Sequence, residues 1–228
     1  MDTYIIGYGL IFLGIIISVL ANVFVKVTYK KYIEVSNSGR LTGFDVARKI
    51  LDSNGLNDVH IVETSGLLSD HYDPTRKVVR LSSSIFHEES ISSLAVAAHE
   101  VGHALQDKDN YMFMRIRSLL VPFVNFISRA GYISILIGLI FGMRDIIYIA
   151  IAMELAVLLF NLVTLPVEFN ASSRALKQLK KLSIARSEDL NGAKKVLFAA
   201  ALTYVASLVT VLLQLLRLLL IAGGRRRD

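Results

Sequence analysis

Apolar residues gather in four long runs, which are separated by two long polar stretches and one short turn. The runs cover Tyr4–Val25, Leu119–Phe141, Ile146–Pro166 and Val196–Ala222. Each exceeds the roughly 18 residues expected of a membrane-spanning helix. As a helix, the first run would be about 33 Å long, against a bilayer core of about 30 Å. The pattern therefore predicts a mainly α integral membrane protein with about four transmembrane helices.

These runs divide the chain into five segments. We expect a first transmembrane helix in residues 1–25, a folded region in 26–118, two further spans in 119–166, a second polar segment in 167–195, and a last span with a basic tail in 196–228. The two polar segments are the only places where chemistry outside the bilayer is expected.

Residues 26–118 show the signals of a small mixed fold. A helical pattern covers Gly43–Asn54, with Thr42 as its N-cap, and a longer helix is expected from about Ser90, as N-cap, to Gln106. Two short segments rich in β-branched residues predict strands, with turn residues between them, at Val59–Glu63 and Val78–Leu81. We therefore expect a small β-hairpin, whose second strand could offer an open edge to an extended peptide.

Composition narrows the class further. Hydrophobic residues make up 54% of the 228-residue chain and charged residues 19%, and there is no cysteine. This apolar content excludes a disordered protein. The absence of cysteine excludes a disulfide-stapled domain and a thiolate metal site.

Basic residues indicate how the chain crosses the bilayer. Twelve of the 25 lie between the first and second runs and seven between the third and fourth, whereas the N-terminus has none. The positive-inside rule then places both polar segments in the cytoplasm of a multi-pass cell-membrane protein. Only Arg225–Arg227 disagree, because four spans would place them outside. The net charge of +6 fits contact with the lipid bilayer, and no aromatic-interleaved basic patch favours nucleic acid.

The second predicted helix contains the sequence His99-Glu100-Val101-Gly102-His103. Two histidines four residues apart project from one helix face and can hold one Zn²⁺, and Glu100 lies within reach of a water on that ion. Gly102 is unfavourable inside a helix by about 1 kcal/mol relative to alanine. A close approach by another backbone, the metal or a substrate would explain it.

A catalytic zinc site needs a third protein ligand and one open position. The remaining histidines are His60, His71 and His87. Glu168 follows the third apolar run and emerges on the same side of the membrane as His99. The residues alone leave these alternatives open.

Four motifs, taken together, resemble the bacterial YugP-like membrane neutral zinc metallopeptidases, which are similar to gluzincins. They are Leu41-Thr42-Gly43, Asp70-His71-Tyr72-Asp73-Pro74, Ala97-Ala98-His99-Glu100-Val101-Gly102-His103-Ala104 and Leu165-Pro166-Val167-Glu168-Phe169. The resemblance covers nearly the whole chain. It implies a zincin-like catalytic region, one zinc ion, Glu168 as third ligand, and protein or peptide substrates, membrane proteins among them.

The expected reaction is hydrolysis of a peptide bond, with His99, His103 and Glu168 as metal ligands and Glu100 as general base. A further group should stabilise the oxyanion, and the candidates are His71, Tyr72 and Arg174. Many gluzincins carry an aspartate four residues after the ligand glutamate, where this chain has Ser172. The residues that orient the ligand histidines therefore stay open among Asn170, Ser172, Asp107 and backbone carbonyls.

Two other functions remain as alternatives. A non-catalytic membrane scaffold, or a protein-quality-control adaptor, could use zinc only to hold its cytoplasmic loop together. A small transporter could use the ionisable residues within the apolar runs, although the chain shows no inverted repeat. A scaffold would not need a carboxylate beside the two histidines, so Glu100 distinguishes it from a peptidase.

Overall fold

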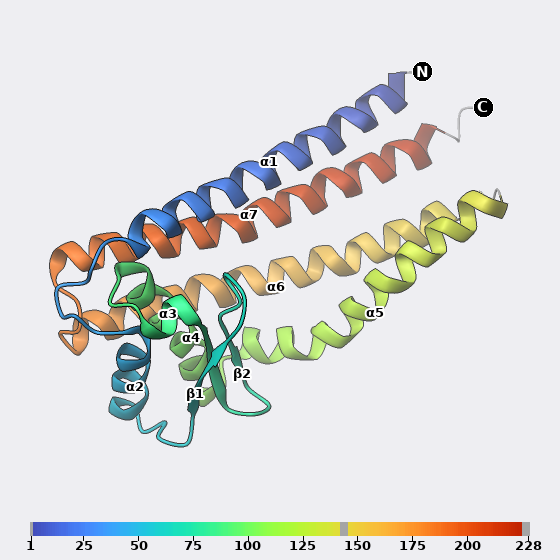
Figure 1. Cartoon of the computed structure of the whole chain (residues 1–228). Coiled ribbons are helices and arrows are strands. Elements are labelled where there is room, and N and C mark those ends of the chain that lie inside the picture. Colours follow the sequence, from blue (N-terminus) through green and yellow to red (C-terminus); the bar gives the residue numbers. More distant parts are fainter. Residues whose placement is uncertain (1, 142–145, 225–228) are drawn as a thin grey trace. The chain divides into compact units, whose positions relative to one another are not determined.

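The computed structural model describes residues 2–141 and 146–224, which fold mainly into helices (Figure 1). In chain order the elements are α1 (Asp2–Ile33), α2 (Gly43–Ser53), β1 (His60–Thr64), β2 (His71–Asp73), β3 (Val78–Ser82), α3 (Ser83–His87), α4 (Ile91–Lys108), α5 (Met112–Phe141), α6 (Ile146–Lys181) and α7 (Ser187–Gly224). They form two compact units. We name residues 1–22, 115–165 and 203–228 the apolar unit, and residues 23–114 and 166–202 the head unit.

Three helices are long and apolar enough to cross a membrane by length and composition, namely Ile5–Ile33 in α1, Ile146–Lys181 in α6 and Ser187–Gly223 in α7. They contain three of the four predicted runs. The remaining run, Leu119–Phe141, lies within α5, but its side chains from residue 128 onward fall outside the described residues, as do Arg225–Arg227. The fourth span and the side of the arginine tail therefore stay predictions.

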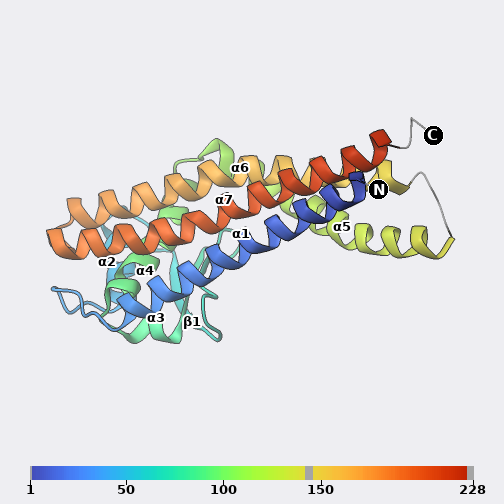
Figure 2. The same cartoon turned by 90° about the horizontal axis from the view of Figure 1, so that it is seen from above.

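Within the apolar unit, α1 and α7 run side by side (Figures 1 and 2). Ser18 of α1 shares a 3.0 Å hydrogen bond with Thr210 of α7, and Ser207 of α7 donates one of 2.9 Å to Asn161 of α6. Because these hydroxyl and amide groups pair with each other between helices, they do not face lipid without a hydrogen-bond partner. Large apolar side chains of α1, α6 and α7 remain exposed on the surface of the unit.

The core of the head unit forms around α4. Its apolar side chains pack with those of α2, β3, α3 and the parts of α6 and α7 that belong to this unit, and the largest fully buried members include Ile50, Leu81, Leu94 and Leu179. Both predicted N-caps are confirmed. Thr42 and Asp45 form a capping box at the start of α2, and Ser90 accepts a hydrogen bond from Ser93 N at the start of α4.

The sheet differs from the expected hairpin. Its strand order is β1-β3-β2, in which β1 pairs parallel and β2 pairs antiparallel with β3. The predicted turn does join a hairpin, but the strand that forms the hairpin with β3 is β2 and not β1. β2 is three residues long and too short to show an alternating pattern. The prediction that residues 78–81 form an open edge is wrong, because β3 is the central strand.

Candidate metal centre

Two imidazole side chains project from one face of α4. His99 and His103 are one helical turn apart, and their ring centroids lie 4.8 Å from each other at an interplanar angle of 83°. Buried residues on both sides of them fix α4 in the core of the head unit, among them Ala98 and Val101. This packing holds the backbone that carries both rings.

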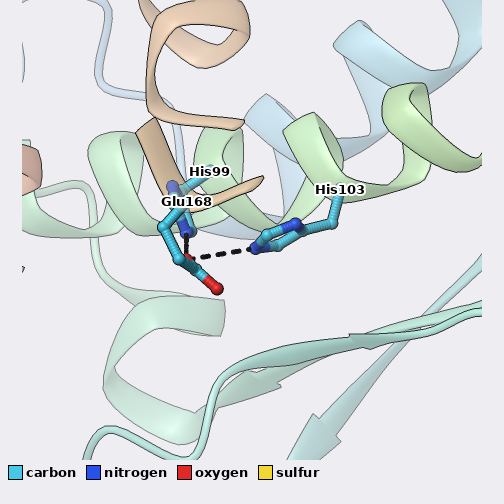
Figure 3. Close-up of side chains that lie close together, drawn as sticks. All are labelled: His99, His103 and Glu168. Carbon is cyan, nitrogen blue, oxygen red and sulfur yellow. Dashed lines mark hydrogen bonds and ion pairs between the residues drawn. The ribbon is translucent and has the colours of Figure 1, made fainter. Parts of the chain in front are cut away.

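Glu168 of α6 completes the cluster (Figure 3). Its Oε2 atom lies 3.2 Å from His99 Nε2 and 3.6 Å from His103 Nε2, and its side chain is almost fully buried, with 2% of the residue exposed. One possible ligand atom from each of the three residues lies within 4.8 Å of the others. The fold thus brings together two histidines and a carboxylate that is 65 or more positions away in sequence.

Gly102 explains how the two helices come so close. A Cβ atom at this position would lie 2.6 Å from the carbonyl oxygen of Ala171 and 3.2 Å from its Cα. Ala171 belongs to α6, one turn beyond Glu168. Of the three explanations left open by the sequence, the structure shows the approach of another backbone, and that approach positions Glu168 against the α4 histidines.

Each imidazole has a hydrogen-bond partner on the nitrogen that faces away from Glu168. His103 Nδ1 donates to Gln106 Oε1 at 3.0 Å, and His99 Nδ1 lies 3.2 Å from the hydroxyl of Ser172. A neutral histidine with its proton on Nδ1 leaves the Nε2 lone pair available. Gln106 Oε1 can only accept, so it favours the His103 tautomer that leaves Nε2 able to bind a metal. The Ser172 hydroxyl can accept or donate, so its contact is compatible with the same tautomer of His99.

Gln106 was not among the residues that the sequence indicated. Its side chain is fully buried, and its amide nitrogen donates to Val167 O at 2.8 Å and to Asn170 Oδ1 at 3.0 Å. The amide orientation is fixed, because only the NH₂ group can face the Val167 carbonyl. The sequence did contain an indication of this role, because residue 106 is three positions after His103 and therefore lies on the same helix face.

Glu100 lies beside the cluster with 8% of its surface exposed. Burial raises the pKa of its carboxyl group, whereas His99 and His103 act in the opposite direction. Among the described residues, no hydrogen bond or ion pair involves this carboxylate. A desolvated, unpaired carboxylate costs stability, and such groups are concentrated at functional sites.

The pKa of His103 is raised. Burial alone would lower it, but the hydrogen bond and negative charge of Glu168, with further contributions from Glu100 and Gln106, outweigh that effect. A proton therefore competes with a metal ion for binding to the His103 imidazole.

The three oxyanion candidates lie in different surroundings. His71 is exposed on β2, and its Nδ1 lies 2.8 Å from Ser69 O. Tyr72 donates a 3.0 Å hydrogen bond to Asp107, and burial together with this bond raises the pKa of its phenol. Arg174 donates to Asn170 Oδ1 at 2.8 Å and pairs with Asp109. Within residues 2–141 and 146–224, none of the three hydrogen-bonds to the cluster.

The other histidines are not part of the cluster either. His60 is exposed on β1, and His87 pairs with Glu63 at 3.2 Å. In the described part of the chain, the group of residues that could hold a metal ion is therefore His99, His103 and Glu168. Imidazole nitrogen and carboxylate oxygen are zinc ligands, and three protein ligands leave one position open, so these residues fit a catalytic zinc ion.

Comparison with known proteins agrees with this donor set. Residues 7–223 match the model of the family described as "Putative neutral zinc metallopeptidase". The chain is also 46% identical, over 197 residues, to "Putative membrane protease YugP" of Bacillus subtilis (strain 168), covering 86% of this chain and 88% of that protein. No solved structure is a significant match. The chain therefore belongs to the neutral zinc metallopeptidase family whose model spans nearly its entire length.

Proposed function

We propose that the protein is a membrane-bound zinc endopeptidase that hydrolyses peptide bonds at the cytoplasmic face of the membrane. The observation that carries the proposal is the convergence of His99, His103 and Glu168 beside the buried carboxylate of Glu100, which no described residue pairs with. The family to which the chain belongs supports it. The chain is also similar to a bacterial protein named "Putative membrane protease YugP". Membrane proteins are included among the proposed substrates because the catalytic residues belong to a chain with helices long and apolar enough to span a membrane.

In this proposal His99, His103 and Glu168 hold one zinc ion, which would polarise the scissile carbonyl and acidify a water molecule. Glu100 accepts a proton from the attacking water and delivers it to the leaving amine nitrogen. Burial raises the pKa of this carboxylate, which makes it a stronger base for the first step. Its conjugate acid is still a stronger acid than a protonated amine, so the proton can pass to the leaving nitrogen in the second step. Gln106 and Ser172 hold the two imidazole rings in orientation.

The oxyanion requires a hydrogen-bond donor, and we assign this role to His71. Tyr72 and Arg174, the other candidates, already donate to Asp107 and to Asn170 and Asp109 respectively. His71 uses Nδ1 at Ser69, and its Nε2 has no partner among the described residues. Replacing His71 by Ala should lower kcat by about 10²-fold while zinc content stays unchanged. An unchanged kcat would remove His71 from the mechanism.

The test of the activity is Glu100→Gln, which keeps the size of the side chain but removes its basicity. We expect the purified variant to retain zinc and to lose cleavage of casein. Glu88→Gln is the matched control, because Glu88 is exposed and lies outside the cluster; this variant should cleave casein like the wild type. Full cleavage by Glu100→Gln would contradict the mechanism and favour the scaffold alternative.

A further inference from the structure

A second polar site lies in the head unit, between the ends of three helices. It is a cavity of about 430 Å³, within the range of about 300–1,000 Å³ that small-molecule sites occupy. Asn54 at the end of α2, the last turn of α4 and one face of α6 surround it. Its charged lining residues are Lys108, Asp109, Arg174, Lys177 and Lys181.

The cavity is separate from the metal centre. Its α6 residues include Arg174, Lys177 and Lys181, which recur every three to four positions and so share a helix face. At 100° per residue that face lies roughly 180–240° around the axis of α6 from Glu168. The cavity therefore opens on the other side of α6 from the carboxylate in the cluster.

The charges in the cavity are unbalanced, with four cations against one carboxylate. Two of the cations have structural partners, since Arg174 pairs with Asp109 and Lys108 donates a 2.5 Å hydrogen bond to Asn54 O. Lys177 and Lys181 form no hydrogen bond or ion pair with any residue in the described ranges. They lie one helical turn apart, so that one ligand can contact both ammonium groups.

Neutral lining groups complete the site. Ser173 and Asn170 lie on the same helix as the lysines, and a hydroxyl or amide donor beside two ammonium groups suits an anion with several acceptor oxygens. A phosphate group has this chemistry, because its oxygens accept several charge-assisted hydrogen bonds at once. A single carboxylate has only two oxygens and one charge.

We propose that this cavity binds a phosphate-bearing anion, either a small soluble phosphate or the headgroup of a phospholipid. Lys177 and Lys181 supply positive charge that no residue in the described ranges neutralises, and the hydroxyl of Ser173 supplies a further donor on the same helix. The site is independent of the proposed peptidase reaction, since none of the residues that would hold zinc lines it.

Occupancy of the cavity could reach the metal centre through hydrogen bonds that the structure contains. Arg174 Nε and Gln106 Nε2 both donate to Asn170 Oδ1, and Gln106 Oε1 accepts from His103. Through these bonds, a ligand in the cavity can affect the orientation of the His103 ring. This effect on the metal centre rests on the proposed function, whereas binding of the anion does not, so binding is measured separately.

The experiment titrates the full-length protein in detergent micelles with inorganic pyrophosphate, using isothermal calorimetry, and compares it with Lys177→Gln/Lys181→Gln. All four lysines are exposed, so the matched control is Lys180→Gln/Lys194→Gln, which removes the same charge from positions outside the cavity. Lys180 shares the last turn of α6 with Lys181, so the control also tests the effect of the helix dipole. A second arm replaces pyrophosphate with phosphatidylglycerol and phosphatidylcholine in native mass spectrometry.

We expect saturable binding that the cavity variant weakens at least tenfold and the control less than twofold. If the cavity variant binds pyrophosphate more weakly than the wild type, the ligand is a soluble phosphate. If it loses only the binding of phosphatidylglycerol, the ligand is a lipid headgroup. The proposal is overturned if neither probe binds, or if both double variants weaken binding equally. Casein cleavage by the cavity variant is measured in parallel. The binding data then test the anion site, and the cleavage data test the peptidase proposal.

Discussion

Ser172 lies four residues after Glu168, and its hydroxyl contacts Nδ1 of His99. Gln106 does the same for His103 through a shorter bond. The sequence predicted His99 and His103 from their spacing on one helix, and Glu168 through the resemblance to a known family. It left the orienting residues open, because a serine or glutamine gains this role only from the packing of α4 against α6.

Replacing Gln106 by Met removes three hydrogen bonds at similar side-chain volume, and leaves the carbonyl of Val167 without this donor. We expect zinc affinity or activity to fall by about 10–100-fold. Ser172→Ala should cost less, because its contact with His99 is longer, at 3.2 Å. Competition with a zinc chelator measures both, and a larger loss in Ser172→Ala would contradict this ranking.

Zinc binding should also depend on pH. Only neutral His103 can bind zinc, and its pKa is raised from 6.5 when no metal is bound. Protons therefore compete with zinc at pH values below that raised pKa, and the apparent affinity should fall as pH decreases from 8 to 5. A chelator competition series across this range checks the prediction, which a constant affinity would disprove.

Among the structural elements, α4 and α6 set the geometry of the centre. The sequence predicted α4 from its N-cap and motif, and the structure confirms it. It could not predict that α6 continues through Pro166 to Lys181, because a proline inside an apolar run usually ends or kinks a helix. The strand β2 was missed, because three residues carry too little pattern.

Gly102→Ala tests the contact between α4 and α6. Alanine favours the helix by about 1 kcal/mol, but its Cβ would clash with Ala171 O at 2.6 Å, and overpacking costs about 1–3 kcal/mol. We expect a lower Tm and weaker zinc binding, because the helices carrying the ligands must separate. Gly9→Ala is the control, since a Cβ at that glycine meets nothing within 4 Å. Equal Tm values for the two variants would refute the packing argument.

At the scale of the whole molecule, the apolar excess of the sequence lies on the exposed faces of long helices, which agrees with a membrane location. Composition and run length predicted this much. Orientation follows from the distribution of basic residues along the chain. The side on which the head unit lies is therefore a prediction of its own.

Cysteine labelling suits this chain because it has no native cysteine. Ser65 is exposed in the head unit, and the positive-inside rule places it in the cytoplasm, whereas Thr3 should lie outside. In intact cells an impermeant maleimide should label Thr3→Cys but label Ser65→Cys only after permeabilisation. The reverse pattern would place the centre on the outer face.

The central claim is that one zinc ion is held by two histidines of α4 and a glutamate of α6. It is tested most directly by the zinc content of protein purified in detergent, measured by plasma mass spectrometry, for the wild type and Glu168→Ala. The control is Glu34→Ala, because Glu34 is exposed and outside the cluster. We predict about one zinc per chain in the wild type and in the control, and a large loss in Glu168→Ala. Unchanged zinc content and affinity in Glu168→Ala would contradict the account.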